Sequence, residues 1–201
     1  MEPDFAGSNV LLSRLKLAGE GDLFMPGDQS YVDSARSEGL VAEERIVCYL
    51  VPTILVPRGN PAGIRGLDDL ARPGVALGLG DAEACAIGRI SQEILERNGV
   101  PSVAIAANTV FSALTVEELA VQVVAGQLDA TIVWDVVAKR HAGQAEALPI
   151  PVGNNVVSVV SIATLTGSTY PEVADAFAAF VTSDRAKVVL QGLGYATEPP
   201  R

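Results

Sequence analysis

Short apolar runs alternate along the whole chain with segments whose apolar residues recur every three or four positions. The runs are typical of buried strands, and the spaced segments are typical of amphipathic helices. This alternation predicts an α/β fold. Strands or extended segments are expected at 22–25, 46–56, 75–80, 103–108, 129–134, 148–152 and 155–163, and helices at 8–17, 30–37, 63–73, 90–98, 116–125, 135–141, 171–183 and 184–191.

Composition excludes several classes of protein. A formal charge of −10 without clusters of Lys or Arg argues against a nucleic-acid partner. The longest apolar run, 46–57, is interrupted by Pro52 and Pro57 and is too short to span a membrane. The N-terminal sequence has no basic segment followed by an apolar one, so no secretory signal is expected in it. Two cysteines and one histidine, without metal-ligand spacing, predict free thiols and no metal site.

Two long extended runs, 46–57 and 155–163, flank the middle third of the chain. Such a pair is expected where a chain crosses from one lobe to another and later returns. The sequence therefore predicts a continuous lobe over 52–156 and a discontinuous lobe that combines 1–51 with 157–201.

Three loops rich in small or polar residues lead into predicted helices: AGSN (6–9), ACAIG (84–88) and LTVEE (114–118). Free N–H groups and the positive end of a helix dipole form an anion site without cationic side chains. Simpler explanations stay open for each loop. ACAIG also fits a tight strand-to-helix turn, Ser8 fits an N-cap, and Thr115 with Glu118 fits a capping box.

Five segments occur in an order that resembles the periplasmic molybdate- and tungstate-binding proteins of ABC transporters, over nearly the whole chain. They are GSNVLLSRLKLAGEGDLFMPGDQSYVDSARSEGL, ILVPRGNP, LDDLARPGVALGLGDAEACAIGRISQEILERNG, GQLDATIVWD and FAAFVTSDRAKVVLQGLGY. The resemblance implies a two-lobed type II periplasmic binding protein fold, with a mixed sheet flanked by helices in each lobe.

The resemblance also implies which groups bind the ligand. Ser8 would contribute its hydroxyl and N–H between Gly7 and Asn9, and the N–H groups of Ile87, beside Ala86, and of Val116 would be further donors. Trp134 stands where many members have a tyrosine, and a core role for this indole stays open. Glu83 and Asp135 are weaker candidates, for which solvation and helix capping respectively are the alternatives. No cofactor and no bound metal are expected, because hydrogen bonds would hold the oxyanion.

The function implied by the resemblance is capture of molybdate or tungstate outside the cytoplasm and delivery to an ABC permease. Members normally have a strand, a serine-bearing loop and a helix before the segment that matches Asp4–Ser8. An incomplete first lobe is therefore expected, with some tendency to self-associate. The alternatives are binding of sulfate or another oxyanion, a ligand-sensing domain of a regulator, or an enzyme with Ser8 or Cys85 as nucleophile.

Overall fold

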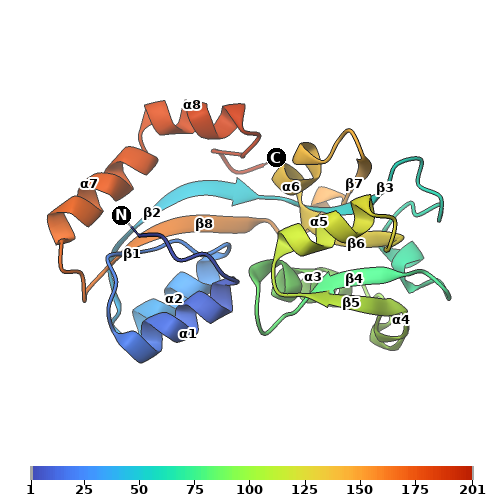
Figure 1. Ribbon diagram of the computed structural model, residues 1–201, viewed down its shortest axis with the longest axis horizontal. Helices are drawn as coiled ribbons and strands as arrows, with labels where there is room; N and C mark the ends of the chain where they lie inside the picture. The colour runs from blue at the N-terminus through green and yellow to red at the C-terminus, as the bar shows by residue number, and fades with distance from the viewer. Residues whose placement is uncertain (1, 201) are drawn as a thin grey trace. The chain divides into compact units, whose positions relative to one another are not determined.

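The computed structural model describes residues 2–200 and divides into two compact units. Unit 1 consists of residues 2–50 and 158–200, and unit 2 of residues 51–157. The chain passes from unit 1 to unit 2 after β2 (Val41–Leu50) and returns at the start of β8 (Ser158–Leu165), as the colours of Figure 1 show.

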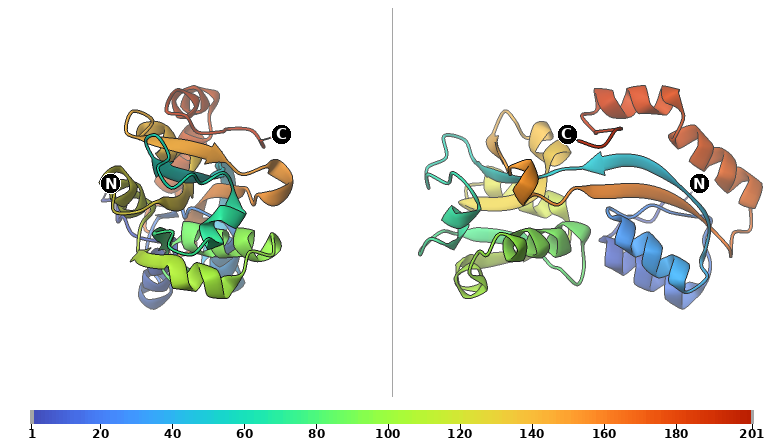
Figure 2. Two further views of the ribbon diagram at one scale, coloured as in Figure 1. Left: turned by 90° about the vertical axis from the view of Figure 1, so that its right-hand side faces the viewer. Right: turned by 180° about the vertical axis from the view of Figure 1, so that it is seen from behind.

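Unit 1 contains a three-stranded sheet in the order β1-β8-β2, in which β1 is the two-residue strand Leu23–Phe24. Strand β8 runs antiparallel to both neighbours. In Figures 1 and 2, two helices lie on one side of this sheet and two on the other. The first pair is α1 (Ser8–Ala18) and α2 (Gln29–Ser37), and the second is α7 (Pro171–Val181) and α8 (Asp184–Gly192).

Unit 2 contains a five-stranded mixed sheet in the order β5-β4-β6-β3-β7. Strand β4 is parallel to β5 and β6, whereas β3 is antiparallel to β6 and β7. The mixed sheet that the sequence predicts is thus found in unit 2, and unit 1 has an antiparallel one. The strands are β3 (Pro52–Pro57), β4 (Leu77–Gly80), β5 (Thr109–Ala113), β6 (Ala130–Trp134) and β7 (Ala145–Pro149).

The helices of unit 2 connect these strands and cover the sheet. All five residues of β6 are buried, as expected for a parallel strand with helices over it. The helical elements are η1 (Leu67–Ala71), α3 (Ala86–Arg97), α4 (Ser102–Asn108), α5 (Val116–Val124), α6 (Asp135–Arg140) and η2 (Val152–Asn154). The α/β class predicted from the sequence is confirmed. No helix within residues 2–200 is long and apolar enough to cross a membrane.

The segment 103–108 is a helix, α4, and the prediction of a strand there is wrong. Ile105 and Asn108, which are three positions apart, are its buried residues, so the segment packs with helical periodicity. The Asn108 amide donates to the carbonyl oxygens of Leu70 and Arg72 at 2.8 and 2.7 Å and thereby holds the end of the helix. The strand follows immediately as β5.

The single strand predicted at 46–56 is two strands, β2 and β3, that belong to different sheets. They separate at Val51, which pairs with Asp135 instead of with a strand. Val51 N–H donates to the Asp135 carboxylate at 3.3 Å, and Asp135 N–H donates to Val51 O at 2.8 Å. A run of apolar residues shows burial but does not show where strand pairing changes.

Candidate functional site

In unit 1, the predicted site residues Gly7, Ser8 and Asn9 lie at the start of α1. The first backbone hydrogen bond of the helix runs from Leu11 N–H to Gly7 O at 3.0 Å, so the Ser8 N–H precedes the helical ladder. The first turn carries no carboxylate. Ser8 is the first helical residue and not the N-cap that the sequence predicts, because Gly7 occupies the cap position.

The Ser8 side chain is nearly buried, and its hydroxyl oxygen accepts a 3.0 Å hydrogen bond from Gly27 N–H. A serine hydroxyl has one proton to donate and two lone pairs. Because Oγ is the acceptor in this bond, the proton remains available for a further bond. Ser8 therefore offers two donors, its hydroxyl and its N–H, at a helix start without negative charge.

In unit 2, the loop after β4 leads into α3, with Cys85 at the N-cap and no side-chain cap. The first helical bonds run from Gly88 and Arg89 N–H to Cys85 O at 3.2 and 3.4 Å, so the N–H groups of Ala86 and Ile87 precede them. Both side chains are buried, and the first turn carries no carboxylate.

The glycines of this turn permit close packing between the end of β4 and the start of α3. A Cβ on Gly88 would lie 2.5 Å from the Asp81 carbonyl group and the Gly80 oxygen, and a Cβ on Gly80 would lie 2.8 Å from Gly88 N. The small residues of ACAIG thus serve the tight strand-to-helix turn, the simpler explanation left open by the sequence. The same packing fixes the direction of the Ala86 and Ile87 N–H groups.

The Cys85 thiol is buried in this turn, with Sγ 3.5 Å from Asp81 O and 3.8 Å from Ala113 O. Burial is the main reason why the pKa of Cys85 is raised above 9.0. The Gly88 N–H opposes this increase in pKa, whereas the negative charges of Asp81 and Glu118 add to it. A thiol in this environment stays protonated at neutral pH, which argues against a nucleophile. Cys48 is also a buried thiol.

Helix α5 begins at Val116 as predicted, but the capping box at its start does not form. The Thr115 hydroxyl donates to the Glu118 carboxylate at 2.7 Å instead of accepting the Glu118 N–H. The other carboxylate oxygen accepts from Leu114 N–H at 3.3 Å. The start of α5 is therefore without a side-chain cap, although Glu117 and Glu118 place negative charge in its first turn.

These two loops of unit 2 meet at one edge of the sheet. Strands β4 and β5 are parallel with Gly80 opposite Ala113, and Asp81 N–H donates to Ala113 O at 2.8 Å. The helix starts that follow β4 and β5, with the N–H groups of Ile87 and Val116, therefore lie at the carboxyl ends of neighbouring strands. In α/β sheets ligands bind at such an edge.

Trp134 ends β6 at the same edge, since β6 is parallel to β4. Its side chain is 6% exposed, which fits the core role left open by the sequence, and its indole N–H has no hydrogen-bond partner among residues 2–200. An indole donates one hydrogen bond and accepts none. Trp134 thus combines a packing role with one unused donor.

The two acidic residues proposed as weaker site residues, Asp135 and Glu83, are placed differently in the structure. Asp135 is the first residue of α6 and not its side-chain cap, because its carboxylate binds Val51 N–H and Lys139 Nζ, the latter at 2.7 Å. Glu83 is exposed and donates its N–H to the Asp81 carboxylate at 2.8 Å. Residues 2–200 contain no cluster of three or more His, Cys, Asp or Glu that could hold a metal ion.

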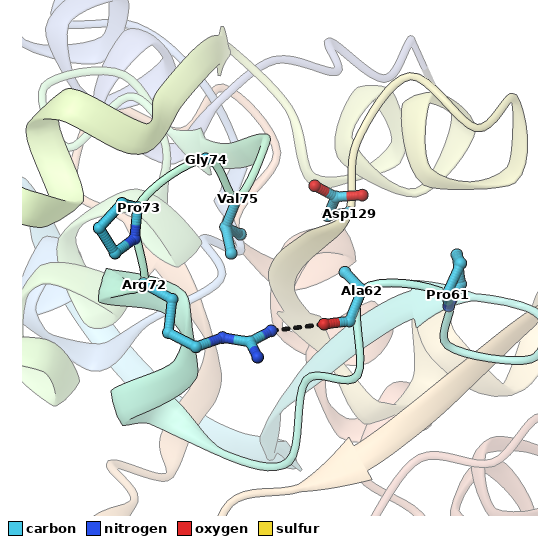
Figure 3. Close-up of a pocket in the computed structure, with 7 residues that line it drawn as sticks. All are labelled: Pro61, Ala62, Arg72, Pro73, Gly74, Val75 and Asp129. Atoms are coloured by element: carbon cyan, nitrogen blue, oxygen red, sulfur yellow. Dashed lines mark hydrogen bonds between the residues drawn. The ribbon is translucent and has the colours of Figure 1, made fainter.

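A pocket of about 570 Å³, which the sequence does not predict, lies at the opposite edge of the same sheet (Figure 3). Val75 precedes β4 and Asp129 precedes β6, so the pocket is at the amino ends of these strands. Its charged groups have partners: Asp129 accepts from Ala76 N–H at 2.8 Å, and Arg72 donates to Ala62 O. It is lined by Pro61, Ala62, Arg72, Pro73, Gly74, Val75 and Asp129.

Comparison with known proteins identifies a family and several relatives. A family model described as bacterial extracellular solute-binding protein matches residues 1–196. The molybdate-binding protein ModA of Mycobacterium bovis is 30% identical over 193 residues, which are 96% of this chain and 72% of that protein. A putative binding protein of Haemophilus influenzae is 28% identical over 195 residues, 97% of this chain and 76% of that protein. The resemblance to molybdate-binding proteins that the sequence indicates is confirmed.

Solved structures share the fold at low sequence identity. The periplasmic molybdate-binding protein of Azotobacter vinelandii superposes with a TM-score of 0.75 at 14% identity, covering 98% of this chain and 86% of that one. A periplasmic thiamin-binding protein superposes with a TM-score of 0.84 at 16% identity, covering 98% and 73% respectively. These similarities confirm the α/β fold of type II periplasmic binding proteins.

Proposed function

Because this chain belongs to the family of bacterial extracellular solute-binding proteins, a class of binding proteins and not of enzymes, we propose that it captures a tetrahedral oxyanion, molybdate or tungstate. The mycobacterial relative named for molybdate binding supports this choice of ligand. We further propose that it acts in the periplasm or an equivalent extracytoplasmic space and delivers its ligand to an ABC permease.

One observation carries the proposal: helix starts in both units present N–H groups without a side-chain cap. They are those of α1 with Ser8, α3 with Ala86 and Ile87, and α5 with Val116. Hydrogen bonds from such donors to an anion contribute about 1.5–3 kcal/mol each. A few fixed donors can therefore replace the hydrogen bonds that an oxyanion makes with water. In the proposal the ligand-binding groups are those of Gly7, Ser8, Asn9, Ala86, Ile87 and Val116 and the Trp134 indole.

The chemistry of these donors also favours a fully deprotonated ligand. N–H groups donate and offer no acceptor for a proton carried by the ligand. Hydrogen phosphate, which carries a proton at neutral pH, would leave that proton without a partner, and an unmade bond in a dry site costs about 1–3 kcal/mol. Molybdate, tungstate and sulfate have no such proton, so sulfate is the main competitor.

Titration calorimetry of the purified chain with molybdate, tungstate, sulfate and phosphate tests the proposal. We expect saturable binding of molybdate or tungstate and at least tenfold weaker binding of phosphate. Ser8→Ala should weaken binding about tenfold to hundredfold, because one anion-bound hydroxyl is lost. Ser13→Ala, an exposed position of the same helix, is the matched control and should bind like the wild type.

The outcomes separate the alternatives. Binding of sulfate in preference to molybdate would assign the chain to another oxyanion within the same family. If none of the four anions binds, oxyanion capture is refuted and the family membership alone remains.

A further inference from the structure

We propose that Ser158 is a positioning residue for oxyanion binding, and that it acts through the turn at Gly27 and Asp28 to orient the hydroxyl of Ser8. The inference rests on the proposed function, since it assumes that Ser8 binds the ligand. All four residues belong to unit 1.

Ser158 is the first residue of β8 and is completely buried. Its hydroxyl lies 2.5 Å from Asp28 Oδ2 and 2.8 Å from the carbonyl oxygen of Gly27. A hydroxyl has one proton, so it is shared between these two acceptors. A buried serine that has two oxygen acceptors within reach is held by hydrogen bonds and not by packing alone. Ser158 therefore connects the strand to the turn before α2.

Asp28 connects the same turn to α2. It is the N-cap of this helix, and its Oδ1 accepts from Ser30 N–H at 3.1 Å and from the Ser30 hydroxyl at 2.5 Å. One carboxylate oxygen of Asp28 thus accepts hydrogen bonds at the start of α2, and the other accepts one from Ser158. The turn is held from the helix side and from the strand side at once.

The turn held in this way passes its orientation on to Ser8. Gly27 is held at its carbonyl by Ser158, and its N–H donates to Ser8 Oγ at 3.0 Å. Because this N–H occupies a lone pair of the hydroxyl oxygen, the Ser8 proton must point away from Gly27. A serine at a helix start without such a partner turns its hydroxyl toward nearby backbone groups instead. The bond thus keeps the proton free for a ligand.

A second buried serine of β8 provides a matched comparison. Ser161 is also completely buried, but its hydroxyl donates to the Gln29 side chain at 2.6 Å and has no bond to the turn at Gly27. Ser158→Ala and Ser161→Ala therefore remove the same group at equal burial from the same strand. Only the first breaks the chain of bonds that reaches Ser8.

A double-mutant cycle on molybdate binding tests the inference. Ser158→Ala should weaken molybdate binding about tenfold in the wild-type background and by less than twofold in the Ser8→Ala background, because the orienting bond has no hydroxyl left to orient. Asp28→Asn keeps an oxygen for the Ser30 N–H and removes the Asp28 acceptor of Ser158. It should weaken binding in the same direction but by less, because the bond from Ser158 to Gly27 O remains, and it provides the measurement if Ser158→Ala does not fold. Ser161→Ala should change binding by less than twofold in both backgrounds.

The results distinguish this inference from the function on which it rests. If the wild type binds molybdate and the losses caused by Ser158→Ala and Ser8→Ala simply add, Ser158 is a structural residue and the inference is overturned. Equal losses from Ser158→Ala and Ser161→Ala would overturn it as well. A wild type that binds no oxyanion refutes the proposed function first, and the positioning role falls with it.

Discussion

The two units hold their hydrogen-bond donors in different ways. In unit 2 the donors are backbone N–H groups at the starts of α3 and α5. Those of α3 are oriented by the close packing of Gly80 against Gly88, where an added Cβ would lie less than 3 Å from backbone atoms. In unit 1 the side-chain donor is the hydroxyl of Ser8, and its direction depends on the neighbouring Gly27 N–H. A backbone donor is fixed by the fold, whereas a side-chain donor needs partners of its own.

The units also differ in how completely they are covered. In unit 2 both faces of β6 are covered, so all five residues of this strand are buried. In unit 1 the helix α8 buries no side chain, and α7 buries only Ala174 and Ala178. The difference indicates that α7 and α8 cover one side of unit 1 only loosely, whereas β6 of unit 2 is fully covered. The predictions below test these two contrasts.

The largest effect is expected at the glycine turn of unit 2. Gly88→Ala would place a Cβ 2.5 Å from backbone atoms of Gly80 and Asp81, which have little room to move. We expect a loss of about 4 kcal/mol or more in the free energy of unfolding, a size that marks a direct clash. Urea denaturation measures it. Gly143→Ala, with nothing within 4 Å of its Cβ, is the control, and equal stabilities of the two variants would refute the tight turn.

The second effect separates a backbone donor from a side-chain donor. Ile87→Ala removes a side chain that is 1% exposed but leaves its N–H in place, so stability should fall by about 3 kcal/mol while oxyanion affinity changes little. Ser8→Ala should show a large loss of affinity and a smaller loss of stability, about 1–2 kcal/mol, because the Gly27 N–H loses its acceptor. Thermal unfolding and calorimetric titration of both variants provide the measurements. A large loss of affinity in Ile87→Ala that persists well below its melting temperature would contradict a backbone donor.

Much of the fold and of the candidate site could be predicted from the sequence, and the parts that could not be predicted have physical reasons. The loops at Ser8, Ala86–Ile87 and Val116 were recognisable because small residues precede the starts of amphipathic helices. The role of Ser158 could not be recognised, because its partners Gly27 and Asp28 are about 130 positions away in the chain. Segment 103–108 is predicted as a strand but is a helix, because short runs of Ala, Ile and Val fit the periodicity of a strand and of a helix equally well.

The cap positions show a second limit of the sequence. Ser8, Thr115 and Asp135 all have the side chains of helix caps, yet none caps its helix. Each is engaged in a tertiary or competing local hydrogen bond: Ser8 with Gly27, Thr115 with the Glu118 carboxylate, and Asp135 with Val51. A local pattern cannot reveal that a distant partner competes for the same side chain.

A third prediction concerns the buried thiol of unit 2. Because burial, with Asp81 and Glu118, raises the pKa of Cys85 above 9.0 in the folded protein, the folded state keeps the proton at a pH where the unfolded state loses it. Stability should therefore decrease as the pH rises above about 9, with a slope of at most about 1.4 kcal/mol per pH unit from this group. Cys85→Ala should show a shallower decrease in urea denaturation from pH 8 to pH 10. Identical slopes in both proteins would show that Cys85 does not contribute.

The smallest effect is expected at the loosely covered side of unit 1, where we propose that a second copy of the chain associates. Val188 and Val189 of α8 are 68% and 57% exposed, and β1 pairs through only two residues. Unpaired strand edges and exposed apolar side chains both favour association. We expect reversible dimers at high concentration in sedimentation velocity.

Val189→Glu should shift this equilibrium toward monomer by several fold, since it places a charge on the apolar surface. The control is Val103→Glu, which makes the same change at a position 82% exposed on α4 of unit 2. If both variants shift the equilibrium equally, the effect comes from net charge and not from the α8 surface. If the wild type stays monomeric at high concentration, the proposed self-association is refuted, and the contrast between the units is then confined to their donors.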